Sequence, residues 1–177
     1  VGDYDDDYPR EKLLRRGFDA AGATVYECRF STDPRFPGLV SLLLLPVYVA
    51  RIASRLYDLS GNGVTPELVV LTKFNPFVIP FVFVYARLVG ASFVYDLFVS
   101  LHRTAEMRGV DSRVIKTVYF VERVVYRLPD YHLVGTDQFA DLYSEMYAVP
   151  RDRFVRLPPG ADSDWFYSRD DIESRDR

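Results

Sequence analysis

At 177 residues, with an apolar fraction of 49% and 15% aromatic side chains, the chain has the composition of a globular domain that buries one hydrophobic core. It carries 22 basic and 25 acidic residues, a formal net charge of −3. This charge excludes the basic field of a nucleic-acid-binding protein, so we expect no nucleic-acid partner.

The cysteine content indicates the redox environment of the protein, and the lengths of its apolar stretches indicate whether it spans a membrane. The single cysteine, Cys28, cannot form an internal disulfide, which favours a reduced, cytoplasmic environment. The two longest apolar stretches, 38–50 and 77–86, both end at an arginine and are shorter than the ~20 residues that span a bilayer. They therefore predict buried elements rather than transmembrane helices.

Helical and strand patterns alternate along the chain. Segments with apolar residues at helical spacing, and with glycine or proline at their ends, lie between short runs of β-branched and aromatic residues that are typical of strands. Residues 1–2 read as the tail of a first strand. In chain order we then expect helix 9–21, strand 24–30, helix 38–59, strand 67–72, helix 76–89, strand 92–99, helix 112–128, strand 131–134, helix 136–147 and strand 154–157.

The order of these elements predicts the fold class. Strands that alternate with helices call for a parallel sheet, because right-handed crossovers place helices over such strands. The continuous apolar run 67–72 is typical of a strand buried on both faces. We expect an α/β domain with a doubly wound, mostly parallel sheet.

In an open parallel sheet, ligands bind beyond the carboxyl ends of the strands. The residues that follow the expected strands are therefore the candidates for a site. They are Gly2, Asp3, Tyr8 and Arg10 after the first strand, Lys73 and Asn75 after the third, Ser100, His102 and Arg103 after the fourth with Asp96 inside it, Thr136 and Asp137 after the fifth, and Gly160 after the last.

Two phosphate-binding motifs are absent. The loop after the first strand lacks G-x-G-x-x-G, and G-x-x-x-x-G-K-[ST] occurs nowhere, which excludes a typical nicotinamide dehydrogenase and a P-loop enzyme. The acidic run 5–7 suggests a metal site, but consecutive carboxylates on a loop are more often solvated. We expect neither a metal nor a cofactor.

Three polar residues in or near strands have alternative interpretations. A carboxylate at Asp96, inside an apolar strand, needs a hydrogen-bond partner or a place beside a ligand. His102 lies in a loop that fits either a catalytic residue or a structural one. His132, beside Leu133 in an expected strand, is typical of a core residue.

Positive and hydroxyl side chains also have two interpretations. Arg10, Lys73 and Arg103 would suit a diphosphate or another anion, or else form surface salt bridges. The Thr136 hydroxyl either caps the helix that it precedes or binds a ligand there.

The last third of the chain resembles a known family. Residues 131–166 read YHLVGTDQFADLYSEMYAVPRDRFVRLPPGADSDWF and contain the turn P-x-G-x-D-x-x-x-F. This segment resembles the end of the N-terminal domain of glycosyltransferase family 4, whose members have the two-domain GT-B fold. The opening GDYDDDYPR, with Leu13 and Leu14 after it, is similar to the family's first strand, loop and helix, with Tyr-Pro-Arg in place of glycines.

The resemblance implies a domain organisation and an activity. Residues 1–162 would form the Rossmann-like, acceptor-side domain, and 163–177 a hinge and charged tail that lead to a second domain. That second domain holds most of the nucleotide-sugar contacts in the family. The implied reaction is transfer, with retention, of a sugar from a nucleotide-diphosphate donor to a sugar or lipid-linked acceptor, without a metal, and the fragment alone would be inactive.

The resemblance also implies site residues. Family contacts to acceptor and donor map onto 3–10, 100–103 and Thr136. The family's histidine about two residues past Asp96 is replaced here by Phe98, and His102 follows four residues later. His102 and Asp96 are therefore the catalytic candidates.

A second hypothesis belongs to another functional class. The apolar residues 42–49, with arginines at one end of the helix, would suit a non-catalytic module that docks on a partner or a membrane surface. On this hypothesis the protein is membrane-peripheral.

Overall fold

The structure, a computed structural model, describes residues 9–28, 45–72 and 76–158. The chain divides into a larger unit, Val1–Tyr4 with Glu27–Pro158, and a smaller unit, Asp5–Tyr26 with Pro159–Arg177. The described strands all belong to the larger unit.

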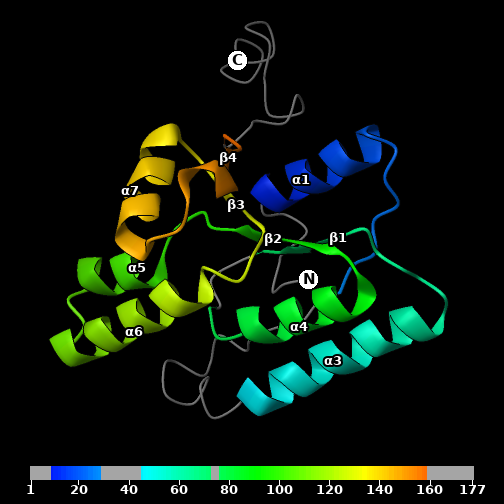
Figure 1. Cartoon of the computed structure of the whole chain (residues 1–177), viewed down its shortest axis with the longest axis horizontal. Coiled ribbons are helices and arrows are strands. Elements are labelled where there is room, and N and C mark those ends of the chain that lie inside the picture. Colours follow the sequence, from blue (N-terminus) through cyan, green and yellow to red (C-terminus); the bar gives the residue numbers. More distant parts are fainter. Residues whose placement is uncertain (1–8, 29–44, 73–75, 159–177) are drawn as a thin grey trace, which may run out of the picture. The chain divides into compact units, whose positions relative to one another are not determined.

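The larger unit alternates helices with short strands, as the sequence predicts (Figure 1). Its elements are α3 (Leu45–Gly61), β1 (Leu68–Leu71), α4 (Ile79–Val89), β2 (Ser92–Asp96), α5 (Leu101–Met107), α6 (Ser112–Val125), β3 (Tyr131–Val134), α7 (Asp137–Tyr147), a 3-10 turn η1 (Arg151–Arg153) and β4 (Phe154–Arg156).

The four described strands form one parallel sheet in the order β1-β2-β3-β4. Helices cross over between neighbouring strands: α4 between β1 and β2, α5 and α6 between β2 and β3, and α7 between β3 and β4. Every neighbouring pair is parallel, with Tyr95 opposite His132 and Leu133 opposite Val155 in the register. The expected α/β class with a parallel sheet flanked by helices is confirmed.

The core lies between the sheet and its helices. In β2, four of the five residues are buried, because a strand in the middle of a parallel sheet has little access to water. Strand residues at the centre pack against buried side chains of α4 and α7. Fully or almost fully buried members include Leu71, Phe93, Tyr95, Val134, Ile79, Val82, Ala86, Ala140, Tyr143 and Tyr147.

Local signals place several helix ends where the sequence predicts them. α4 ends at Gly90, whose φ of 75° is left-handed and favours glycine, and the N–H of Ala91 donates to the Ala86 carbonyl at 2.9 Å. α7 begins after Thr136, the predicted cap. α6 begins at the predicted residue, Ser112, and is capped by Asp111, whose carboxylate accepts from the Arg113 N–H at 2.8 Å.

Several details of the predicted elements are wrong. Residues 24–28 form no strand, and the strand expected at 92–99 ends at Asp96. α5 replaces the loop expected after that strand, because contacts with a distant helix stabilise its first turn. In α6, Val125 is buried but Val114 is 49% exposed, so the valines of this helix do not all face the core. Residues 1–2 and 38–44 lie outside the described part of the chain.

The smaller unit contributes α1 (Pro9–Ala20). Its proline stands at the first turn, where the missing N–H has no helical partner to lose. The helix ends as predicted, at Gly22, which has a φ of 78° and donates its N–H to the Asp19 carbonyl at 3.0 Å.

Candidate functional site at the carboxyl edge of the sheet

The parallel ladder brings the carboxyl ends of the four described strands to one edge of the sheet. Thr72 follows β1, Gly135 follows β3, and Leu157 follows β4 and donates its N–H to the Val134 carbonyl at 2.7 Å. The loops after these strands therefore leave the same edge, which is the arrangement expected of a ligand-binding α/β domain.

Several predicted site residues cannot be placed at this edge. Some lie outside the described residues and remain predictions: Gly2, Asp3, Tyr8, Lys73, Asn75 and Gly160. Arg10 lies in the first turn of α1, in the smaller unit.

Asp96 is the last residue of β2 and is only 5% exposed. It pairs in the ladder with Leu133, next to the strand end where the crevice is expected. Burial, in the first place, raises the pKa of the neighbouring Tyr95, and the charges of Glu122 and Asp96 add to this effect. Tyr95 is therefore a neutral hydroxyl at ordinary pH.

Ser100 caps α5. Its hydroxyl oxygen accepts the backbone N–H of Arg103 at 3.0 Å, and its carbonyl accepts the Thr104 hydroxyl at 2.9 Å. The residue is completely buried. The side chain of Ser100 is thus the buried N-terminal cap of α5.

The amide groups at the start of α5 also bind a buried carboxylate. Glu122 of α6 accepts the N–H of Leu101 at 2.7 Å and that of His102 at 3.2 Å. It accepts in addition the hydroxyls of Tyr126 at 2.6 Å and Tyr147 at 2.8 Å. Four donors compensate the cost of burying this carboxylate, whose residue is 0% exposed.

His102 turns its ring toward α6. The ring centroid lies 5.0 Å from that of Tyr119, and Nε2 lies 3.4 Å from the Glu106 carboxylate. The residue is 9% exposed, and its buried Nδ1 has no hydrogen-bond partner. Its neighbour Arg103 is about half exposed and pairs with Glu106 at 2.8 Å.

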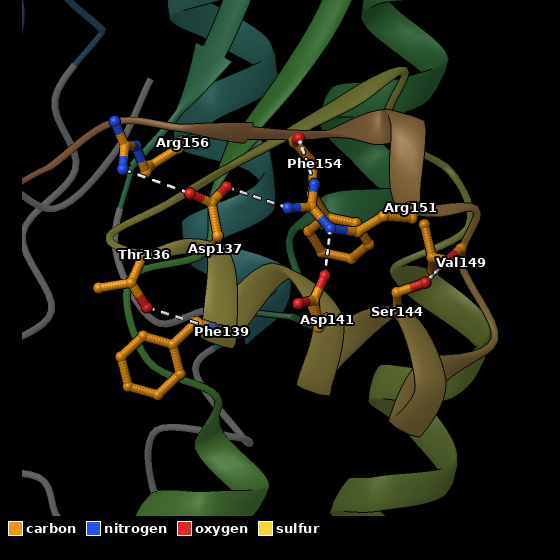
Figure 2. Close-up of polar contacts among 9 residues, drawn as sticks. All are labelled: Thr136, Asp137, Phe139, Asp141, Ser144, Val149, Arg151, Phe154 and Arg156. Carbon is orange, nitrogen blue, oxygen red and sulfur yellow. Dashed lines mark hydrogen bonds and ion pairs between the residues drawn. The ribbon is translucent and has the colours of Figure 1, made fainter.

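Thr136 and Asp137 open α7 (Figure 2). The Thr136 hydroxyl accepts the N–H of Phe139 at 3.2 Å, so the capping interpretation holds. Asp137 forms ion pairs with Arg151 at 3.0 Å and with Arg156 at 3.3 Å. The Asp137 carboxylate is thus paired with one arginine in the turn before β4 and with one inside β4.

Arg151 ties α7 to the segment that leads into β4. Its Nε contacts the Asp141 carboxylate at 2.6 Å and its Nη1 donates to the Phe154 carbonyl at 3.2 Å (Figure 2). The hydrogen bond that Arg151 donates to Asp141, first, and the one that it donates to Asp137 raise the pKa of the Arg151 guanidinium. The start of α7 and the end of β4 therefore form one connected surface.

Sequence reasoning missed Glu122, Arg151 and Arg156. A signal for Glu122 exists, because it is the one acidic residue in the apolar stretch 114–125. Nothing local marks the two arginines, whose partners lie 10 to 19 residues away.

His132, interpreted from sequence as a core residue, is completely buried. Its Nε2–H donates to the Tyr126 carbonyl at 2.8 Å, and its ring stacks on Phe154 at 5.0 Å between centroids. Burial is the main cause that lowers the pKa of His132 to about 4. It is a neutral structural residue.

Metal-binding groups and membrane-spanning helices are both absent from the described residues 9–28, 45–72 and 76–158. This part of the chain contains no group of three or more histidine, cysteine, aspartate or glutamate side chains placed to hold a metal ion. No helix in it combines the length and apolarity needed to cross a bilayer. The predicted docking residues 42–49 are only partly described; in that part, Val47 is 46% exposed.

Comparison with known proteins agrees with the fold and with the resemblance seen in the sequence. A search of curated proteins gives no match. A family model described as a glycosyl transferase 4-like domain matches residues 3–160, which is most of the chain. The chain therefore belongs to the glycosyl transferase 4-like domain family.

Proposed function

We propose that the chain is the N-terminal, acceptor-side half of a retaining glycosyltransferase. Residues 1–162 form this domain, and 163–177 lead to a second domain that supplies most of the contacts to the nucleotide-sugar donor. The match of the family model over 3–160 carries the proposal. The common edge at which the described strands end supports it, because such an edge can face a second domain across a cleft.

In the proposed reaction, the bond between the anomeric carbon and the leaving diphosphate breaks, and a bond to an acceptor oxygen forms. The acceptor hydroxyl transfers its proton to an oxygen of the leaving diphosphate, and the configuration at the anomeric carbon is retained. Stabilisation of the negative charge on the leaving diphosphate is the main contribution of the protein. Closure of the two domains excludes water.

Two described side chains suit contacts with this ligand. Arg103 uses one guanidinium nitrogen for Glu106 and is about half exposed, so its other N–H groups can bind a phosphate. Thr136 uses its oxygen to accept from Phe139, and its own hydroxyl proton stays available to donate. Lys73 and Arg10 are proposed to add positive charge.

Asp96 and His102 are proposed as the catalytic pair. Asp96 stands at the end of β2, and His102 lies six residues later in α5. The place of His102 just after β2, at the edge of the sheet where ligands bind, supports a role beyond packing, whereas His132, whose Nδ1 is also unpaired, lies inside the sheet. The free, buried Cys28 supports a cytoplasmic, reducing location.

The proposal is tested with a protein that extends past Arg177 into the downstream coding sequence. Incubated with UDP-glucose or GDP-mannose, it should release the nucleoside diphosphate, and proton NMR should show product with the donor's anomeric configuration. The 177-residue chain alone should show no turnover. Absence of a second α/β domain downstream, or an inverted product, would contradict the proposal.

Variants of the extended protein test the assigned residues. Arg103→Gln should lower kcat/KM for the active donor by about tenfold, because one charge-assisted contact to the diphosphate is lost. Arg55→Gln is the matched control, since Arg55 is an exposed arginine on α3. Equal activity of the two variants would remove Arg103 from the site.

A further inference from the structure

We propose that the outward face of α6 docks on an anionic membrane surface. This α6 face consists of Arg113, Val114, Lys116, Phe120 and Val124. The proposal concerns a surface rather than the sugar-transfer site, and its test needs no transferase activity.

The α6 face exposes large apolar side chains. Phe120 is 67% exposed, Val124 is 50% exposed and Val114 is 49% exposed, whereas Glu122 and Val125 point to the interior. Helical spacing of three and four residues aligns Arg113, Lys116, Phe120 and Val124 on the solvent side. Apolar groups gathered on one helix face are unfavourable in water and indicate a contact surface.

The surface continues into the turn before α6. Met107, the last residue of α5, is 86% exposed, and Val110 is 38% exposed. Arg108 lies between them and is also exposed. α5 and α6 pack side by side in the structure (Figure 1). The turn therefore adds two apolar groups and one cation next to the α6 face.

The charge of this region is opposite to that of the chain. From 107 to 127 the sequence has five basic and two acidic residues, a net charge of +3, while the whole chain has −3. One of the two acids, Glu122, is buried, and the other, Asp111, caps α6. The exposed surface of α6 is thus cationic.

These cations also lack acidic partners. Within the described residues, Arg108, Arg113 and Lys116 form no ion pair, whereas Arg103 pairs with Glu106 and Arg87 with Asp130. Unpaired cations keep their full charge for an external anion. A cationic helix face that also exposes an aromatic ring has the composition of helices that lie in the interface of anionic bilayers.

A comparison with α4 and a comparison with nucleic acid as the partner both favour a membrane. α4 also exposes apolar residues, at Phe81, Val84 and Leu88, but its one arginine is paired, so charge does not select a partner there. Nucleic acid would use the cations of α6 but would gain little from the exposed valines and Phe120, because its backbone presents phosphates. A lipid surface satisfies both kinds of side chain.

The experiment is cosedimentation of the 177-residue chain with vesicles. Vesicles with about 30% phosphatidylglycerol in phosphatidylcholine should bind at least about tenfold more strongly than pure phosphatidylcholine, because each cation near an anionic surface contributes. Raising NaCl from about 0.1 M to about 0.5 M should weaken this binding, since salt screens exposed charges. Equal binding to both vesicles, or none to either, would overturn the proposal.

Variants locate the surface. The double change Arg113→Glu with Lys116→Glu, and separately Phe120→Ser, should each lower binding by about tenfold. The matched control is Arg51→Glu with Arg55→Glu, two exposed arginines one turn apart on α3, and should change binding by less than about twofold. Loss of binding in the control instead of the α6 variants would contradict the proposal.

Two checks keep the result specific. The urea midpoints of all variants should match that of the parent chain, because the changed side chains are exposed; Val114→Ser replaces Phe120→Ser if that variant unfolds. A 20-nucleotide RNA and a DNA duplex of equal length are titrated in parallel. Binding of either nucleic acid that exceeds binding to the anionic vesicles would overturn the membrane assignment.

Discussion

The carboxylate of Glu122 in α6 accepts a hydrogen bond of 2.7 Å from the backbone N–H of Leu101, the first residue of α5. The two residues are 21 positions apart in the chain. This contact, together with the cap by Ser100, satisfies amide groups that a short helix otherwise leaves without partners. The position of His102 on α5 therefore depends on a buried acid of the next helix.

We expect Glu122→Ala to destabilise the protein by about 3 kcal/mol or more, because two amides and two tyrosine hydroxyls would lose their acceptor in the interior. Urea unfolding monitored by circular dichroism measures the change in the free energy of unfolding. Glu145→Ala, at an exposed acid of α7, is the control and should change it by less than about 0.5 kcal/mol. A loss below about 1 kcal/mol for Glu122→Ala would mean that the network has other acceptors.

His132 should make the protein less stable in acid. Its Nδ1 has no partner, and burial lowers its pKa in the folded state to about 4, below the ~6.5 of an unfolded chain. Below pH ~6.5 the unfolded state therefore binds a proton that the folded state does not, and stability falls as the pH drops to about 4. Above pH ~6.5 the ring is neutral in both states, and the free energy of unfolding is higher by up to about 3 kcal/mol than below pH ~4.

Two measurements check this pH dependence. The imidazole resonances of His132 should titrate with a midpoint near 4 rather than near the ordinary ~6.5. In urea unfolding, the parent chain should lose about 2 kcal/mol more than His132→Asn between pH ~7 and pH ~4.5. A midpoint near the ordinary value would contradict the neutral, buried state of the ring.

Removal of the α7 cap should have a moderate effect. Thr136→Ala should cost ~1 kcal/mol, because the Phe139 N–H loses its acceptor, while Thr136→Ser keeps the hydroxyl and should cost less than ~0.5 kcal/mol. Thermal and urea unfolding measure both. Equal stabilities of the alanine and serine variants would show that the hydroxyl does not stabilise the helix.

A glycine at position 148 should stabilise the protein. Ala148, which ends α7, has a left-handed φ of 53°, where a Cβ is unfavourable. Ala148→Gly should raise the free energy of unfolding by about 0.5 kcal/mol. Ala140→Gly, inside the same helix, should lower it by at least ~1 kcal/mol, and the opposite signs of the two changes are the result to look for.

Much of the larger unit follows from local patterns. The strand at Tyr131–Val134 has the predicted bounds, and α7 follows with Thr136 as its cap. Gly90 ends α4 as predicted. These features depend on side-chain periodicity and on the conformational preference of a residue within a few positions, so a short window of sequence contains the information.

The candidate site was predicted less completely. The sequence indicates the strand ends and, through the turn at 158–166, the family. It does not show that Asp137 is paired with Arg151 and Arg156. The catalytic and binding roles of Asp96, His102 and the other site residues stay predictions.

By itself, the sequence determined the alternation of helices and strands from residue 67 onward apart from α5, the parallel α/β class and the family, because periodicity, glycine and proline positions and a short motif are local properties of the chain. Tertiary structure decided that α5 exists, that its first turn binds Glu122, and which face of α6 stays in water. Hydrogen bonds between residues 20 to 25 positions apart depend on how elements pack in space, and no local pattern specifies that packing.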